Sequence, residues 1–166
     1  ATTKSEENVQ TAQILQANWR EIGVETEIVS LEIGDLQESL IKTRRFDILL
    51  IGEELQENID LYPFFHSSQA GAPGLNLSSL KDVETDRLLD NIRQTTSYDD
   101  QVALTKTLLQ RIDELAPSVY LYSPQVPYYV GRAIDNVQIP TQAGTIADRF
   151  YLFHNWAKED KHIWEN

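Results

Sequence analysis

The sequence predicts an α/β fold in which a mixed sheet, containing parallel strands, is flanked by helices. Two observations predict it. A helical pattern over Glu6–Ile22 leads directly into the β-branched segment Val24–Leu31, and a second helix, opening at Gly34-Asp35, leads into the apolar run Phe46–Ile51. A strand, a crossover helix and a further strand make a βαβ unit, whose crossover is right-handed in nearly all proteins. We therefore expect helices packed against the faces of this sheet.

The first helix is predicted by an apolar stripe and a glycine stop. Its apolar residues recur at intervals of three or four, as on one face of an amphipathic helix. The residues of this stripe are Val9, Ala12, Leu15, Trp19 and Ile22. Gly23 follows as a C-terminal cap, because glycine tolerates the left-handed conformation in which helices often end. The segment from Glu6 to Ile22 is therefore expected to be helical.

The second helix and the strand after it are predicted from their ends. Asp35 and Glu38 stand at the spacing of a capping box, in which each side chain bonds the other residue's backbone N–H. A basic cluster at Lys42, Arg44 and Arg45 suits the C-terminal end of this helix through the helix dipole. Phe46–Ile51 is apolar enough to be covered on both faces, as parallel strands usually are.

Two further long helices and several short elements follow a long loop, which spans 53–81. The loop carries interleaved aromatic residues and is expected to contain a short helix around Leu61–His66. A third long helix is expected over Val83–Gln94, with its apolar residues inward. A fourth begins after Ser97, a good N-cap residue, and ends before Pro117. The remaining expected elements are strands at Val119–Tyr122 and Tyr128–Val130, while the apolar clusters Val137–Ile139 and Phe150–Trp156 are left unassigned.

Composition excludes several classes of partner. The chain has 166 residues, a length typical of one domain with room for a small appendage, and 41% of them are hydrophobic. Its net charge is −12 and it has no run of Lys or Arg, so neither a nucleic acid nor an anionic membrane surface is an expected partner. No apolar run approaches the roughly 20 residues that span a bilayer.

The chain has no cysteine and no methionine. Without cysteine it has no disulfides, no thiol catalysis and no Cys-ligated zinc, and the cellular compartment is left open. The sequence opens Ala-Thr-Thr-Lys rather than with methionine. We expect that a leader was removed or that the sequence is a segment of a longer protein.

Candidate ligand-binding residues follow the apolar strand Phe46–Ile51. In α/β proteins, ligands bind in the crevice outside the carboxyl ends of the strands. This strand ends at a glycine and is followed by acidic, aromatic and histidine side chains, and an asparagine follows a glycine-rich turn later in the loop. The candidates are Gly52, Glu53, Glu54, Asp60, Tyr62, His66 and Asn76.

Each candidate also has a purely structural interpretation. Glu53 and Glu54, with Glu57, can form a solvated acidic loop, or one or two of them can meet a cationic ligand group. Asp60 can cap a short helix beginning at Leu61 or contact a ligand. Asn76 can hydrogen-bond its own turn or a peptide backbone. His66 can be a structural residue whose ring bonds the backbone.

Catalysis and metal binding have weaker signals. Ser67 and Ser68 follow His66, but no Gly-x-Ser-x-Gly sequence surrounds either serine. A hydrolase built on Asp60, His66 and these serines would need all of them within hydrogen-bonding reach. The three histidines are far apart in the sequence, without the His-x-x-x-His spacing of zinc sites. We expect no catalytic residue, no metal site and no cofactor.

A succession of segments resembles the extracellular solute-binding proteins of ABC importers. The group that it resembles is the bacterial peptide-binding family (solute-binding protein family 5), which also includes nickel- and oligosaccharide-binding members. The matching segments lie in order along nearly the whole chain: Trp19–Val24, Glu27–Glu32, Phe46–Gly52, Asp60–Ser68, Gly74–Ser78, Thr85–Leu89, Ala116–Pro124 and Arg149–Trp156. No single segment is as specific as a set of metal ligands; the order and spacing of all of them carry the resemblance.

The resemblance implies a periplasmic-binding-protein-like fold of two lobes that close over a ligand. Residues 1–166 would be the C-terminal part of such a protein, mostly its second lobe, with the N-terminal lobe and the signal or lipid anchor absent. It implies an extracellular, periplasmic or cell-surface location, an oligopeptide ligand, and delivery to a membrane permease. The resemblance also implies that residues 1–166 contact the N-terminal lobe of the same chain. It implies contact with the membrane only through the absent anchor.

The chain departs from the family pattern in the loop after Gly52. The family often has an aromatic residue where Glu53 stands, and an acidic-Pro-acidic pattern where this chain reads Asn58-Ile59-Asp60. In some peptide-binding members a carboxylate in this loop pairs with the amino terminus of the peptide. The resemblance offers that role to Asp60, with Glu53 or Glu54 as substitutes. The ligand class therefore stays open: a nickel complex, an oligosaccharide and a stand-alone protein-interaction module are alternatives.

Overall fold

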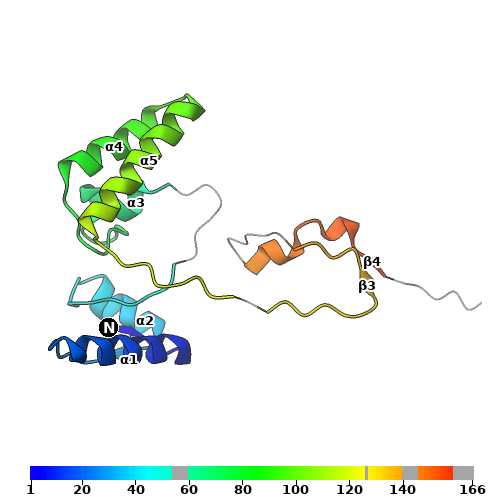
Figure 1. The fold of residues 1–166 in the computed structure, drawn as a ribbon, viewed down its shortest axis with the longest axis horizontal. Coiled ribbons are helices and arrows are strands. Elements are labelled where there is room, and N and C mark those ends of the chain that lie inside the picture. The colour runs from blue at the N-terminus through cyan, green and yellow to red at the C-terminus, as the bar shows by residue number, and fades with distance from the viewer. Residues whose placement is uncertain (54–59, 126, 140–145, 159–166) are drawn as a thin grey trace, which may run out of the picture. The chain divides into compact units, whose positions relative to one another are not determined.

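The computed structural model describes residues 1–53, 60–125, 127–139 and 146–158 (Figure 1). The chain divides into two compact units. Unit 1 comprises Ala1–Gly52 with Asp60–Val119, and unit 2 comprises Glu53–Ile59 with Tyr120–Asn166. Unit 1 contains a small parallel sheet with its helices and a helical cluster, whereas the described part of unit 2 contains a short antiparallel pair and two turns of 3₁₀-helix.

The sheet of unit 1 is built around a strand at the start of the chain. Strand β1 (Thr2–Thr3) pairs in parallel with β2 (Ser30–Leu31), and Thr2 also forms a parallel bridge with Leu50. The Thr2 hydroxyl donates to the Leu50 carbonyl at 2.8 Å, and Thr2 is 1% exposed. β1 therefore lies between the two segments that the sequence predicted as strands, and its two residues carry no pattern that would reveal it.

The predicted strands are shorter than expected, and one is less covered. Of Val24–Leu31 only Ser30–Leu31 is a strand, and of Phe46–Ile51 only Leu50 pairs with another segment. Full cover of Phe46–Ile51 on both faces was wrong, since Ile48 is 47% exposed. The reason is that β1, the partner of both segments, is itself two residues long and offers few backbone groups for pairing.

Helix α1 (Glu6–Glu21) matches the prediction closely. The Ser5 hydroxyl accepts from the Asn8 N–H at 3.3 Å and caps its start. Gly23 has φ +83° just beyond its end, as expected of a glycine stop. Most of the predicted stripe is half-buried against the sheet side of unit 1, but Ile22 lies beyond the last helical residue and is 74% exposed.

The second helix begins earlier than predicted and lacks the capping box. Helix α2 (Ile33–Leu36) continues as the π-helical turn η1 (Gln37–Ile41), and Leu36 is fully buried. The residue before the helix is Glu32, whose side chain makes no capping bond, so Asp35 lies in the first turn rather than at the cap. The Lys42 ammonium pairs with Glu38, one turn back, at 2.5 Å.

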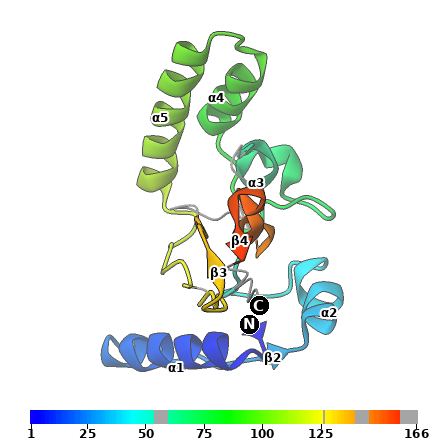
Figure 2. The ribbon, with the colours of Figure 1, turned by 90° about the vertical axis from the view of Figure 1, so that its right-hand side faces the viewer.

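The helical cluster of unit 1 confirms three predicted helices. It comprises the short helix α3 (Tyr62–Phe65) and the 3₁₀ turn η2 (Ser67–Gln69), followed by α4 (Val83–Gln94) and α5 (Tyr98–Leu115). Helices α4 and α5 lie side by side, with α3 against α4 (Figure 2). Their shared core consists of Phe65, Leu88, Leu89, Leu108 and Ile112, each at most 8% exposed.

The caps of α4 and α5 explain where these helices begin. The Asp82 carboxylate accepts the Thr85 N–H at 2.9 Å at the start of α4, and the Ser97 hydroxyl accepts the Asp100 N–H at 3.4 Å at the start of α5. Arg111 of α5 also binds Asp82, with 2.9 Å between Nη2 and Oδ1. This bidentate pair and its hydrogen bonds hold the pKa of Asp82 well below its usual range.

In unit 2, strand β3 (Ile134–Asp135) pairs with β4 (Ala157–Lys158) in antiparallel register, and the 3₁₀ turns are η3 (Ile146–Phe150) and η4 (Phe153–Asn155). The expected strands at Val119–Tyr122 and Tyr128–Val130 were wrong: their described residues adopt no strand. Tyr120 and Tyr129 are 76% and 90% exposed. A strand requires a regular ladder of backbone hydrogen bonds with a neighbour, and these segments belong to neither of the two sheets of the described residues.

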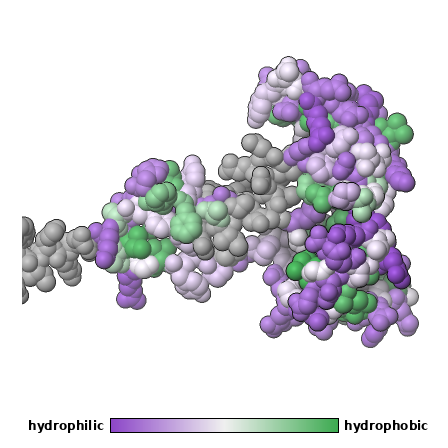
Figure 3. Space-filling view, turned by 180° about the vertical axis from the view of Figure 1, so that it is seen from behind, coloured by the Kyte–Doolittle hydropathy of each residue, from purple (hydrophilic) through white to green (hydrophobic). Residues whose placement is uncertain are grey.

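The surface of the described chain is mostly polar on the face shown in Figure 3, with apolar residues scattered among hydrophilic ones. None of the helices within the described residues is long and apolar enough to cross a membrane.

Candidate functional site

The predicted site residues separate into a group that the structure brings together and a group that it does not. Asp60, Tyr62 and His66 lie at the start of the helical cluster, on or beside α3. Gly52 and Glu53 are exposed and precede the part of the loop that is not described, and Glu54 lies outside the described residues. Although the residue as a whole is exposed, loss of water around its carboxyl group raises the pKa of Glu53.

Asp60 is held within the chain by two neighbours. Its Oδ1 accepts the Tyr62 N–H at 3.1 Å, which is the helix-start role weighed for this residue in the sequence. Its Oδ2 accepts from Arg93, which lies near the end of α4, through Nη2 and, at 3.2 Å, through Nε. The bond to Arg93 is the main cause that lowers the pKa of Asp60. About half of the Asp60 side chain remains exposed.

A stack of three planar groups stands beside this ion pair. The Arg93 Cζ lies 3.6 Å from the centroid of the Tyr62 ring. The Tyr62 and His66 rings are nearly parallel, with centroids 4.1 Å apart and 14° between their planes. Two groups this close to one ring must occupy its opposite faces. Tyr62 is therefore enclosed between a guanidinium and an imidazole, an arrangement stabilised by cation–π attraction and ring stacking.

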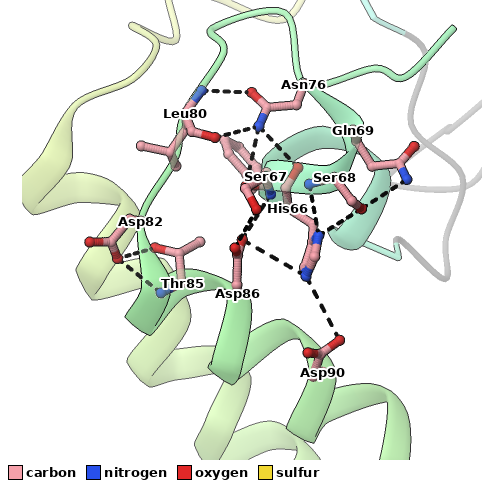
Figure 4. Close-up of polar contacts among 11 residues, drawn as sticks. His66, Ser67, Ser68, Gln69, Asn76, Leu80, Asp82, Thr85, Asp86 and Asp90 are labelled. Carbon is pink, nitrogen blue, oxygen red and sulfur yellow. Dashed lines mark hydrogen bonds and ion pairs between the residues drawn. The ribbon is translucent and has the colours of Figure 1, made fainter. Parts of the chain in front are cut away.

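His66 is oriented by the 3₁₀ turn that follows it (Figure 4). Its Nδ1 accepts the Ser68 N–H at 3.1 Å and lies 2.8 Å from the Ser68 hydroxyl. Because Nδ1 accepts a backbone hydrogen bond, the neutral ring carries its proton on Nε2. That Nε2 lies 3.9 Å from a carboxylate oxygen of both Asp86 and Asp90 on α4. The His66 side chain is 12% exposed.

Asp86 joins the same turn to helix α4. One of its carboxylate oxygens accepts the Ser67 N–H at 2.8 Å, and the other accepts the Ser67 hydroxyl. Figure 4 shows Asp86 and Asp90 rising from α4 toward the His66 ring. The stack therefore meets α4 at both ends, through Arg93 itself at one end and through Asp86 and Asp90 beside His66 at the other.

Asn76 is a buried structural residue in this chain. It is 0% exposed, and its Nδ2 donates to the Leu80 carbonyl at 2.9 Å and to the His66 carbonyl at 3.1 Å. Its Oδ1 accepts the Leu80 N–H at 3.0 Å and the Ser78 hydroxyl at 3.1 Å. These contacts match the turn role that the sequence offered for Asn76 and leave it no surface for a ligand. They hold the loop 75–80 against the His66 backbone (Figure 4).

Close backbone packing fixes the same loop from the other side. A Cβ at Gly74 would lie 2.1 Å from the Gln69 carbonyl oxygen, so the approach of these two backbone segments requires glycine. Arg44 lies just beyond η1, in the left-handed region with φ 54°. Its guanidinium donates to the Ala70 carbonyl at 3.1 Å and to the Gly74 carbonyl at 2.6 Å. The loop that carries His66 is thus connected to both parts of unit 1.

The geometry does not assemble a hydrolase from the expected residues. Asp60 is engaged by Arg93 and Tyr62, and the carboxylates beside His66 belong to Asp86 and Asp90. The Ser68 hydroxyl is paired with His66 inside the capping turn of η2. Within the described residues there is no group of three or more His, Cys, Asp or Glu side chains arranged to hold a metal ion.

Three residues of this site were missed by the sequence analysis: Asp86, Asp90 and Arg93. A signal was present, because their spacing of four and then three residues places them on one face of α4. The amphipathic pattern of α4 identified only its apolar face. The charged stripe beside that face contacts Asp60, Ser67 and His66, while the apolar face packs against Phe65 of α3.

One curated relative matches most of the chain. The oligopeptide-binding protein AppA of Bacillus subtilis (strain 168) is 29% identical over 114 residues, which are 68% of this chain and 21% of the relative. No family model matches the chain.

Two solved structures match the fold over nearly the whole chain, and a third matches it over 70%. The structure of AppA from Bacillus subtilis in complex with a nonapeptide has a TM-score of 0.74 and 22% identity, covering 96% of this chain and 31% of that protein. NikZ from Campylobacter jejuni in complex with Ni(L-His) has a TM-score of 0.67 and 20% identity over 95% of this chain and 32% of NikZ. A nickel ABC transporter structure from Bacillus halodurans has a TM-score of 0.58 and 26% identity over 70% of this chain and 24% of that protein.

These matches confirm the predicted fold class, a periplasmic-binding-protein-like α/β fold with a parallel-containing sheet flanked by helices. By their names, the relatives are binding or transport proteins rather than enzymes. The chain spans about a third or less of the length of each. Sequence and fold together confirm the resemblance: over most of its length, this chain is similar to part of a solute-binding protein of a peptide- and nickel-type ABC importer.

Proposed function

We propose that this chain is part of the substrate-binding component of an ABC importer, which captures oligopeptides outside the cell and delivers them to a membrane permease. The observation that carries the proposal is the similarity to an oligopeptide-binding protein over 68% of the chain, together with a fold match to the peptide complex of that protein over 96%. The function is non-catalytic, and the location is extracellular, periplasmic or on the cell surface.

The chain corresponds to the C-terminal part of such a protein, mostly its second lobe, and its first partner is the N-terminal lobe of the same polypeptide. A ligand that bridges two lobes shifts an existing equilibrium from an open to a closed form. The closed form then docks to the permease. The share of the relatives that the chain covers, about a third or less, supports a partial correspondence, and the C-terminal position rests on the sequence resemblance.

The ligand wall that we propose consists of the exposed part of Asp60 and the half-buried Tyr62, whose ring faces are covered by Arg93 and His66. Gly52, Glu53 and Glu54 remain proposed ligand-binding residues on the basis of the sequence alone. Asn76 is left out because it is fully buried.

The proposal is tested by isothermal titration of the natural full-length polypeptide that carries this chain, using a pool of short peptides. Binding at micromolar concentration or tighter, weakened in Asp60→Ala, supports both the function and the wall. Binding that Asp60→Ala leaves unchanged keeps the function and removes Asp60 from the wall. A folded protein that binds no peptide contradicts the proposed function.

A nickel complex is the second candidate ligand, because two of the matching structures are named for nickel and one contains Ni(L-His). The imidazole of His66, whose Nε2 lies 3.9 Å from a carboxylate oxygen of Asp86 and of Asp90, is the side chain that we propose would contact such a complex. The same titration with nickel and free histidine in place of peptides separates the two candidates. Binding of the nickel complex but not of peptides would favour the second.

A further inference from the structure

Unit 1 contains two parts that do not share one apolar core. The first is the sheet part, Ala1–Gly52, in which Leu36 is fully buried. The second is the helical cluster, whose core residues and the half-buried residues packed on them all come from 61–112. Burial of apolar surface is the main force that fixes one element against another. Because the core of the cluster does not extend into the sheet part, polar contacts between the two parts become important for their alignment.

Arg44 makes such contacts from the sheet part. It is half-buried, and its Nε and Nη2 donate to the carbonyls of Ala70 at 3.1 Å and Gly74 at 2.6 Å. Its Nη1 donates to the Ile41 carbonyl, at the end of its own helical turn, at 2.8 Å. A guanidinium carries its N–H donors in one rigid plane, so bonds to three carbonyls fix both its position and its orientation. Arg44 therefore joins the end of η1 to the loop that follows η2.

The turn at this position does not itself require arginine. The φ of Arg44 is 54°, in the left-handed region that glycine enters without a steric cost and that residues with a Cβ avoid. Glycine would therefore form the same turn more easily. The three hydrogen bonds of the side chain offset the cost of this backbone conformation, and they reach out of the sheet part.

Both ends of this joint lie next to proposed ligand-binding residues. Arg44 lies just before the apolar segment that leads to Gly52. At the other end, the Ala70 N–H donates to the Ser67 carbonyl at 3.2 Å, within the turn that follows His66. The proposed ligand-binding residues are thus divided between the two parts that Arg44 joins.

We propose that Arg44 is a positioning residue, which aligns the sheet part with the helical cluster so that residues of both parts meet the ligand together. The inference rests on the proposed function and adds a residue that acts without touching the ligand. Loss of the Arg44 side chain leaves the proposed ligand-binding residues in place but allows the two parts to move. The apparent dissociation constant then rises by the inverse of the fraction of molecules that keep the alignment.

The first measurement is calorimetric titration of the pool of short peptides into the natural full-length polypeptide, Arg44→Gly and Arg44→Ala. Both variants lose the three side-chain bonds. Arg44→Ala should melt at a lower temperature than Arg44→Gly, because alanine retains the cost of the left-handed backbone. If a tenth of the molecules keep the alignment, both variants should bind peptides about tenfold more weakly, despite their different melting temperatures.

The second measurement reads the alignment itself. Spin labels on Gln10→Cys in α1 and Gln110→Cys in α5, both exposed positions, report the distance between the two parts by double electron–electron resonance, in a background without other cysteines. Arg44→Gly should broaden this distribution of distances.

Two further variants separate the role of the guanidinium from that of its charge. Arg44→Lys keeps the charge and can bond a carbonyl but lacks the planar fork, so it should recover part of the affinity. Arg45→Ala removes the neighbouring exposed arginine and should change neither the distances nor the affinity.

Three results would overturn the inference. If Arg44→Gly binds peptides as tightly as the unmodified protein, Arg44 does not position the ligand-binding residues, and the proposed function stands. If the affinity falls without a broader distribution of distances, Arg44 acts otherwise than by aligning the two parts. If the folded, unmodified protein binds no peptide, the proposed function fails and this inference fails with it.

Discussion

Replacement of Asn76 by alanine tests whether this one side chain holds the loop 75–80 against the His66 backbone. Asn76 is fully buried, and its amide bonds both the N–H and the carbonyl of Leu80, at 3.0 and 2.9 Å. Alanine can make neither bond, and a buried polar group left without a partner costs about 1–3 kcal/mol. With both Leu80 groups released, and water able to reach them partly, we expect a loss of about 2–4 kcal/mol of unfolding free energy.

The assay is urea unfolding followed by circular dichroism, compared with Asn8→Ala. Asn8 provides a matched control because its Nδ2 donates one side-chain bond, to the Thr3 hydroxyl at 2.6 Å. Loss of one such bond costs about 1 kcal/mol. If Asn76→Ala costs no more than Asn8→Ala, the network around Leu80 does not hold the loop and the reasoning is wrong. Since Asn76 has no exposed surface, its folded variant should also retain the ligand affinity of the unmodified protein.

The remaining predictions concern the neighbouring loop and the start of α4. Gly74→Ala should destabilise unit 1 by several kcal/mol, because its Cβ would lie 2.1 Å from the Gln69 carbonyl oxygen and the backbone would have to move. Thermal melting checks this. Gly34→Ala is the control, because a Cβ at Gly34 would meet open space. The pKa of Asp82 is lowered mainly by Arg111, so its contribution to stability is present above the unfolded value near 4 and is lost as the pH falls below it. Stability between about pH 5 and 2 should therefore fall more steeply in the unmodified protein than in Asp82→Asn, and equal slopes would contradict this assignment.

The helices were predictable because their signals are local. Helix α4 spans Val83–Gln94, as predicted, and α5 begins after its Ser97 cap and ends before Pro117. The repeat of the apolar residues and the caps lie within the helix or one residue beyond it. Helix α2 is the exception: Asp35 has the spacing of a capping box, but the chain enters the helix three residues earlier, from Glu32.

The strands were predicted less well because pairing depends on residues far away in the sequence. β1 has two residues and no periodicity, yet it is the common partner of β2 and Leu50. The aromatic segment Val119–Tyr122 has the composition of a strand, but it joins neither of the sheets of the described residues. Composition reports a preference for extended structure and does not report whether a neighbouring strand exists.

The candidate site shows the same division between local and distant information. Tyr62 and His66 are four residues apart across α3, so their stacking follows from local geometry. Arg93 lies 33 residues from Asp60 in the sequence, and the two side chains form an ion pair. Asp60 is therefore not the free carboxylate that the sequence suggested. The sequence could nominate Asp60, but its hydrogen-bonding capacity depends on a partner that only the fold reveals.

Helix α4 serves two purposes on two faces, and this separation allows stability and recognition to be studied independently. Leu88 and Leu89 face the core shared with α3 and α5. The charged stripe of Asp86, Asp90 and Arg93 meets the turn and ring of His66 and the carboxylate of Asp60. Substitutions on the apolar face remove buried area and act on folding, whereas Arg93 is exposed and contributes little to the core. A change at Arg93 that alters ligand affinity without altering stability therefore acts through the wall itself.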